Sequence, residues 1–217
     1  MPTFPSTIWQ DLDRARNGEA AAWTAVVNRY RPAIHSFLRS AGRSEADAED
    51  IAQDVFLQMV RSSLLEGAHP RRGKFRSLVL AITTNVMRHK LRDDRAEKRG
   101  GGKKPVSLEG QDVPAPEEEE SFDREWVKRL VASALEELAK RRPSYHEALR
   151  LSLENQSQAQ MAQTLHKSAA QVNNHVHRAR MWVRRRLRAL VRESCADAET
   201  YREELAYLGK YVDLDGE

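Results

Sequence analysis

One run of residues toward the end of the sequence carries side chains suited to hydrogen bonding with nucleic acid. Gln171, Asn174 and Arg178 are spaced three and four apart, so a helix presents them on one face. Amide and guanidinium groups form paired hydrogen bonds with base edges in the major groove of DNA. The residues expected to read or approach DNA, here called the reading set, are Ser168, Ala169, Ala170, Gln171, Asn173, Asn174, His175, Arg178 and Arg180.

The elements that must position these side chains follow a helix-turn-helix pattern. Ser157 is suited to cap a short helix over residues 157–165, and Ser168 is suited to cap a longer helix over residues 168–192. Residues 166–192 hold eight basic and no acidic residues. The alternative is an ordinary helical hairpin with a solvated arginine face, and the lack of acidic residues argues against it.

An acidic stripe lies in the first third of the chain. Asp47, Asp50 and Asp54 stand at positions i, i+3 and i+7 beside Gln53, so a helix presents them together. Such a face is suited to a basic partner surface, and a solvated helix face is the alternative. The stripe alone does not decide between these interpretations.

A polar and basic stripe follows on the next predicted helix. Its residues share one face, which favours contact with a nucleic-acid backbone. The preceding loop widens this patch with Arg71, Arg72 and Lys74, and solvation is again the alternative. The stripe consists of Asn85, Arg88, Arg92, Arg95 and Arg99.

Apolar residues recur at helical spacing through most of the chain, and no alternating run predicts a strand. The expected fold is therefore all-α, with one small helical domain at residues 1–99 and a second at residues 122–192. Glycines, prolines and four consecutive glutamates predict a flexible acidic linker at residues 100–121. Residues 193–217 form an acidic C-terminal tail with a weak amphipathic pattern.

The charge distribution says more than the net charge. The formal net charge is only +4, but residues 70–104 hold twelve basic and three acidic residues. Together with the basic block at residues 166–192, this indicates two separate contacts with a polyanion. Cys195 is the single cysteine, which excludes a disulfide framework and a cysteine-rich zinc site.

Signals of membrane insertion, secretion and catalysis are missing from the sequence. No apolar run approaches the ~20 residues of a membrane helix, and no secretion signal is seen, so a soluble cytoplasmic protein is expected. There is no HExxH motif, no glycine-rich phosphate loop and no cysteine-histidine cluster. His175 and His177 point apart on a helix and cannot share a metal ion. We therefore expect no enzyme activity, no metal and no cofactor.

Over most of residues 8–192 the sequence resembles bacterial sigma factors of the extracytoplasmic-function group, which carry only regions 2 and 4 of the sigma-70 family. The resemblance implies a protein that binds core RNA polymerase and directs promoter recognition, DNA melting and transcription initiation. Three segments carry it in the family's order: DAEDIAQDVFLQMVR at 47–61, GKFRSLVLAITTNVMRHKLR at 73–92 and SQAQMAQTLHKSAAQVNNHVHRAR at 157–180.

The resemblance also implies roles for each segment. The first is similar to the helix that binds the clamp helices of the polymerase largest subunit, through Asp47, Asp50, Gln53, Asp54 and Phe56. The second is similar to the helix that opens and reads the minus-ten element, with Asn85 in the pocket for a flipped base. The third, holding the reading set, is similar to the minus-thirty-five reader. The full minus-ten set is Lys74, Arg76, Asn85, Arg88, His89 and Arg92.

The chain departs from the family pattern at several places. His166 and Lys167 replace the usual glycine and aliphatic residue, so we expect altered turn geometry and a lost apolar contact. Met59 and Val60 stand where a tryptophan is usual. The acidic tail is additional, and one hypothesis is that it folds over the basic patches and represses DNA binding until polymerase displaces it.

Other functions and partners stay open at this point. A helix-turn-helix regulator that binds DNA as a dimer without joining polymerase is the main alternative. A nucleic-acid hydrolase or a structural adaptor fits the residues less well. An anti-sigma factor is a further candidate partner.

Overall fold

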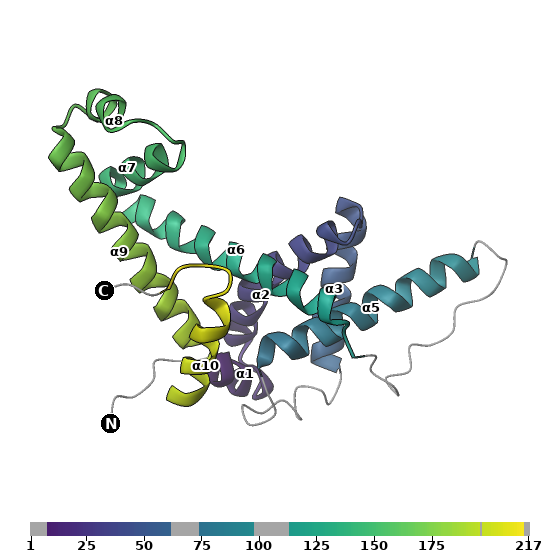
Figure 1. The fold of residues 1–217 in the computed structure, drawn as a ribbon. Helices are drawn as coiled ribbons and strands as arrows, with labels where there is room; N and C mark the ends of the chain where they lie inside the picture. The colour runs from purple at the N-terminus through teal and green to yellow at the C-terminus, as the bar shows by residue number, and fades with distance from the viewer. Residues whose placement is uncertain (1–7, 62–73, 98–112, 196, 215–217) are drawn as a thin grey trace. The chain divides into compact units, whose positions relative to one another are not determined.

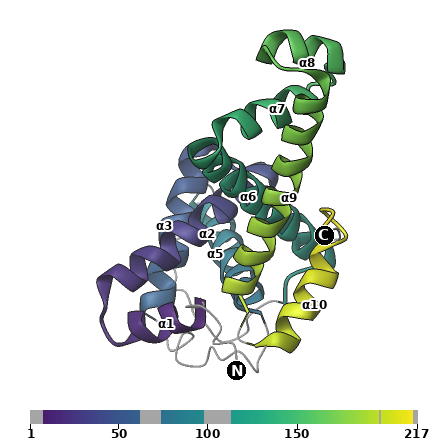
Figure 2. The same cartoon turned by 90° about the vertical axis from the view of Figure 1, so that its left-hand side faces the viewer.

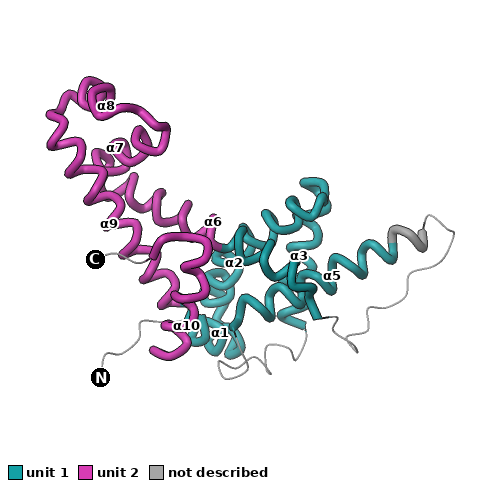
Figure 3. The backbone as a smooth tube through the Cα atoms, viewed as in Figure 1, with its two compact units in different colours: residues 1–126, 194–196 teal, residues 127–193, 197–217 magenta. Residues whose placement is uncertain are grey.

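The computed structural model describes residues 8–61, 74–97, 113–195 and 197–214. Within these residues the chain forms nine α-helices and no strand (Figure 1). The all-α fold expected from the apolar spacing is therefore confirmed. The chain divides into two compact units, residues 1–126 with 194–196 and residues 127–193 with 197–217 (Figure 3).

Unit 1 is built from four complete helices and the start of another. Gly18 follows the first helix with φ +86°, a left-handed conformation that glycine adopts without steric cost. The third helix packs against both the second and the fourth. In chain order the elements are α1 (Ile8–Arg16), α2 (Ala20–Ser40), α3 (Glu45–Arg61), α5 (Phe75–Glu97) and residues 116–126 of α6 (Pro116–Arg141).

Aromatic side chains fill much of the core of unit 1. Tyr30 of α2 is 1% exposed, and its ring stacks on that of Trp126 with the centroids 4.8 Å apart. The same ring meets the edge of Phe75 at 5.1 Å, and Phe37 meets Phe122 at 5.6 Å. Each such side chain contributes about 1.5–3 kcal/mol when fully buried. The start of α6 is therefore part of this core.

Burial raises the pKa of Tyr30 to about 12, because the charged phenolate is poorly solvated in the core. Since the folded-state pKa lies above the ordinary value of about 10, the neutral phenol stabilises the fold. This contribution is complete below about pH 10 and is lost as the pH rises through about 12. We expect the free energy of unfolding to fall over that range, and Tyr30→Phe to remove this part of the fall. Denaturant titrations of both proteins at several pH values test this, and identical profiles would contradict it.

Unit 2 is organised around one long helix. α9 packs against α7, α8 and α10, and two apolar clusters support its contacts with α7 and α8. One cluster contains Leu138, Leu149 and Ala179, and the other contains Leu151, Met161 and Val172. Besides residues 127–141 of α6, the helices are α7 (Pro143–Leu153), α8 (Gln158–Leu165), α9 (Ala169–Glu193) and α10 (Ala198–Leu208).

The bounds of α8 and α9 agree within one residue with the helices expected at 157–165 and 168–192. Ser157 caps α8 in a reciprocal box with Gln160. His166 ends α8 with φ +51° and ψ +46°, a left-handed conformation that costs a residue with a Cβ atom roughly 1 kcal/mol. His166 therefore adopts a conformation that favours glycine, at a cost in backbone strain.

The expected linker at residues 100–121 overlaps the start of α6. Residues 98–112 lie outside the described part of the chain, but α6 begins at Pro116. Proline fits the first turn of a helix, and Glu117, Glu118 and Glu119 follow where carboxylates interact favourably with the helix dipole. The interpretation of the acidic run as unable to order is therefore wrong, because these residues begin a helix.

Within the described residues, no helix combines the length and apolar character needed to span a membrane. Nor do those residues gather three or more histidine, cysteine, aspartate or glutamate side chains in a way that could hold a metal ion. Cys195 is buried.

Candidate partner and nucleic-acid interfaces

The first half of α9 presents the residues expected to read DNA. Val172, Val176 and Ala179 are buried and fix the orientation of the helix. The remaining surface of this half of the helix is open, since His175 is half-buried and the other members of the reading set are exposed. The structure therefore brings the whole reading set together on one helix end.

Ser168 and Gln171 form a reciprocal cap at the start of α9. The Gln171 backbone N–H donates to Ser168 Oγ at 3.2 Å, and the Ser168 backbone N–H donates to Gln171 Oε1 at 2.9 Å. Two N–H groups that lack helical partners are satisfied in this way. Gln171 thus has a capping role that the sequence analysis missed, although the S-x-x-Q spacing signals it.

Arg178 joins the reading set to a residue of α7. Its Nε donates to Asn174 Oδ1 at 3.1 Å, and its Nη1 donates to Tyr145 Oη at 3.4 Å. The ring of Tyr145 also meets the ring of His175 edge-on, with the centroids 5.0 Å apart. Tyr145 was not expected in this group, because a tyrosine on the preceding helix carries no DNA-binding signal in the sequence alone.

The C-terminal segment docks on the second half of α9 (Figure 2). Leu208 and Leu214 are buried, so residues described until now as a tail have a packed structure. The arginines contacted lie beyond the reading set. The contacts are Arg184 with Asp213, Arg188 Nε with the Leu214 carbonyl oxygen at 3.0 Å, and Arg192 over the ring of Tyr201 at 5.4 Å.

We expect removal of residues 198–217 to raise non-specific duplex affinity several-fold, because arginines of α9 become free to release phosphate counterions. Asp213→Asn should act in the same direction with a smaller effect, and it leaves the buried leucines in place. Filter binding over a range of salt concentrations measures both effects. An unchanged salt slope in both variants would remove the hypothesis that this segment restrains DNA binding.

α3 presents most of the residues expected to contact a protein partner. Asp47, Asp50, Gln53 and Asp54 are exposed. Phe56 differs, because it is 7% exposed and its ring packs edge-on against Trp23 at 6.1 Å. Its expected role as a contact residue is therefore corrected to a role in the core of unit 1.

Two apolar residues that the sequence analysis missed extend this surface. Leu57 is 47% exposed and Val60 is 60% exposed. Exposed apolar side chains within a polar rim are typical of protein interfaces. The signal was helical spacing, since Leu57 follows Gln53 by four residues and Asp54 by three, and Val60 follows Leu57 by three. The α3 face is defined from here on as Asp50, Gln53, Asp54, Leu57 and Val60.

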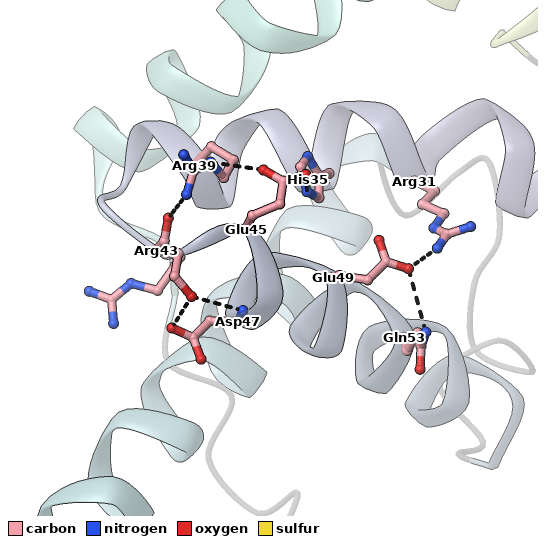
Figure 4. Close-up of polar contacts among 9 residues, drawn as sticks. Arg31, His35, Arg39, Arg43, Glu45, Asp47, Glu49 and Gln53 are labelled. Carbon is pink, nitrogen blue, oxygen red and sulfur yellow. Dashed lines mark hydrogen bonds and ion pairs between the residues drawn. The ribbon is translucent and has the colours of Figure 1, made fainter.

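Polar contacts attach α3 to α2 beside this face (Figure 4). Arg31 pairs with Glu49, which also accepts a hydrogen bond from Gln53 Nε2 at 3.4 Å. Arg39 Nε lies 3.3 Å from Glu45 Oε2 at the start of α3. These contacts hold the orientation of α3, although exposed ion pairs each add only about 0–1 kcal/mol.

The acidic residues of α3 have different local roles. Ser44 Oγ donates to Asp47 Oδ2 at 2.6 Å, and this hydrogen bond holds the pKa of Asp47 below its ordinary value. Asp47 is therefore part of the helix cap. Asp50 Oδ2 lies 3.3 Å from Lys90 Nζ of α5, while Asp54 stands one turn further along the exposed face.

The surface expected on α5 is only partly exposed. Arg76 and Asn85 are 6% and 4% exposed. Arg76 Nε donates to Asp123 Oδ1 of α6 at 2.6 Å, so Arg76 belongs to a buried ion pair and not to the open surface expected for it. Of the remaining minus-ten set, Lys74, Arg88 and His89 are half-buried and Arg92 is exposed.

The first turn of α6 also contacts Arg88. Arg88 Nη2 donates to Glu118 Oε2 at 2.7 Å, and the Ala115 backbone N–H donates to the same carboxylate at 2.9 Å. Arg71, Arg72 and Arg99, together with the side chain of Arg95, lie outside the described part of the chain. Within unit 1, the start of α6 therefore binds the guanidinium of Arg88 on the basic face of α5.

Comparison with known proteins gives two findings. Residues 26–97 match the sequence model of the family described as sigma-70 region 2. The chain is also 31% identical over 84 residues to the RNA polymerase sigma factor CarQ of Myxococcus xanthus, an alignment that covers 39% of this chain and 47% of the relative. The chain thus spans about half the length of that relative.

Residues 26–97 are therefore similar to region 2 of the sigma-70 family. The region 2 match begins within α2 and includes both the α3 face and the described part of α5. It ends before unit 2, so the reading set on α9 lies outside it.

Proposed function

We propose that this chain is a sigma factor of the extracytoplasmic-function group that binds core RNA polymerase through unit 1 and promoter DNA through both units. One observation carries the proposal: the segment matching region 2 contains an exposed acidic and apolar helix face, and a separate unit carries an exposed polar helix end. The chain performs no chemistry of its own in this proposal. Binding energy alone drives DNA opening.

Polymerase is bound by the α3 face. Asp50 and Asp54 meet a basic surface, for which the clamp helices of the polymerase largest subunit are the proposed site, and Leu57 and Val60 fill the centre of the contact. Charged groups speed association and set orientation, while the apolar centre contributes affinity through burial. An anti-sigma factor that covered the same face would block this step.

The minus-ten element is captured by α5. Asn85 hydrogen-bonds an unpaired base, and Arg88 and Arg92 hold the phosphate backbone, with Lys74 and His89 beside them. Flipping a base costs a few kcal/mol, which these contacts offset. Because Arg88 is paired with Glu118 and Asn85 is buried, capture requires Arg88 to leave that carboxylate and Asn85 to become accessible.

The minus-thirty-five element is read by the first half of α9. Asn174, His175 and Arg178 reach base edges in the major groove, and the N-terminal amides near Ser168 meet a phosphate. Arg180 adds sequence-independent charge. This reader sets the register of the polymerase on the duplex.

We expect Glu118→Gln to raise affinity for a single-stranded minus-ten oligonucleotide about twofold to fivefold, because Arg88 loses a competing carboxylate. Fluorescence anisotropy at low salt measures this change. Glu120→Gln is the matched control, since Glu120 lies two residues after Glu118 in α6 and pairs with exposed Arg124. An equal gain in both variants would point to a general charge effect instead.

Run-off transcription tests the proposal as a whole. The purified chain is added to core polymerase with a library of promoter fragments, and its co-elution with core enzyme is measured in parallel. Co-elution and initiation from a defined promoter set support the proposal. A dimeric chain that binds palindromic duplexes and does not co-elute would establish the helix-turn-helix regulator in its place.

A further inference from the structure

Tyr145 stands where the core of unit 2 meets the reading set. It lies near the start of α7, and its half-buried ring packs against the cluster of Leu138, Leu149 and Ala179. Its hydroxyl reaches Arg178 on α9. The residue is thus anchored by its ring and directed toward DNA-facing side chains by its polar end.

Two members of the reading set are in contact with this tyrosine. The ring of His175 meets it edge-on, with an interplanar angle of 64°, and His175 Nδ1 is buried. The second is Arg178, whose Nη1 donates to Tyr145 Oη at 3.4 Å while its Nε donates to Asn174 Oδ1 at 3.1 Å. Tyr145 therefore contacts both a histidine and an arginine of the reading set.

This arrangement affects how Arg178 can bind. A guanidinium is a rigid planar fork, so two hydrogen bonds at Nε and Nη1 fix the plane in which its remaining N–H groups point. A long side chain that is ordered before binding loses less conformational entropy when it meets its ligand. A guanidinium with a fixed plane also discriminates better between base edges, because paired hydrogen bonds require a defined geometry.

We propose that Tyr145 is a positioning residue for the minus-thirty-five reader, which orients Arg178 through its hydroxyl and His175 through its ring. The inference rests on the proposed function, since it assumes that α9 reads DNA. It predicts that Tyr145 sets sequence discrimination while leaving sequence-independent binding unchanged.

The test uses the full-length chain and a duplex that it selects from a random library. Affinities for the selected and for a scrambled duplex are compared in the parent, Tyr145→Phe, Arg178→Ala and the double variant. We expect Tyr145→Phe to weaken selected-duplex binding about threefold to tenfold with an unchanged scrambled-duplex affinity and salt slope. In the Arg178→Ala background the same change should have little further effect, because the hydroxyl acts through that arginine.

Two additional variants separate positioning from folding. Tyr201→Phe changes a half-buried tyrosine on α10, whose ring lies under Arg192, and should leave discrimination intact. Tyr145→Ala removes the ring as well and should lose more discrimination than Tyr145→Phe, with thermal unfolding recorded for every variant. The inference is overturned if Tyr145→Phe leaves discrimination unchanged or weakens binding to both duplexes equally. It is also overturned if Tyr145→Phe has its full effect in the Arg178→Ala background. If the parent selects no duplex, the DNA-reading part of the proposed function is overturned, and this inference falls with it.

Discussion

Asp123→Ala is expected to lower the free energy of unfolding of unit 1 by about 3–5 kcal/mol, the largest stability effect we anticipate for a single substitution. Asp123 Oδ1 accepts a hydrogen bond from Arg76 Nε at 2.6 Å, and both residues are less than a tenth exposed. Removing the carboxylate takes from a buried guanidinium the hydrogen bond and the negative charge of Asp123. Calorimetry should show a fall of roughly 10 °C or more in the melting temperature of this unit.

A matched control and a compensating pair make the Asp123 prediction specific. Glu120→Ala removes a carboxylate from the same helix, but its partner Arg124 is exposed, so the effect should stay below about 1 kcal/mol. Replacing both buried partners, as Arg76→Met with Asp123→Leu, should recover most of the loss, because apolar residues of similar volume often substitute well for a buried pair. If Asp123→Ala and Glu120→Ala lowered the free energy of unfolding equally, the buried ion pair would contribute no more to stability than an exposed one.

Local helix signals made most of the elements predictable from sequence. The spacing of apolar residues and the caps at Ser157 and Ser168 locate α8 and α9, and both caps are present in the structure. The acidic start of α6 was misjudged for a physical reason. Glutamates after a proline resemble an unfolded linker in composition, whereas the same residues stabilise a helix N-terminus.

Tertiary burial was harder to anticipate than helix position. Periodicity placed Arg76 on a basic segment and Phe56 on the acidic helix, but it carries no information about which neighbours cover them. Asp123 lies 47 residues from Arg76, and Trp23 lies on a different helix from Phe56. The same limit hid Tyr145, whose contacts with the reading set exist only once α7 and α9 pack together.

Loss of the acidic groups on α3 is the functional change from which we expect the largest effect. Asp50→Ala with Asp54→Ala should weaken binding to core polymerase by at least about tenfold, because it removes two exposed carboxylates that we propose to meet a basic surface of the polymerase. Leu57→Ala should weaken it as well, mainly by faster dissociation, because an apolar contact at the centre of an interface is lost. Surface plasmon resonance with immobilised core enzyme measures both rates.

The chain offers a close control for each change on α3. Glu199→Ala with Glu203→Ala removes two exposed carboxylates four residues apart on α10, so the net charge changes equally. Leu153→Ala truncates another exposed leucine, which is 64% exposed against 47% for Leu57. If the control pairs reduced polymerase binding as much as the α3 variants, the attraction would be a property of overall charge or exposed apolar area. Selective loss in the α3 variants, with affinity for the selected duplex retained, would instead assign polymerase binding to this face and DNA reading to a separate surface.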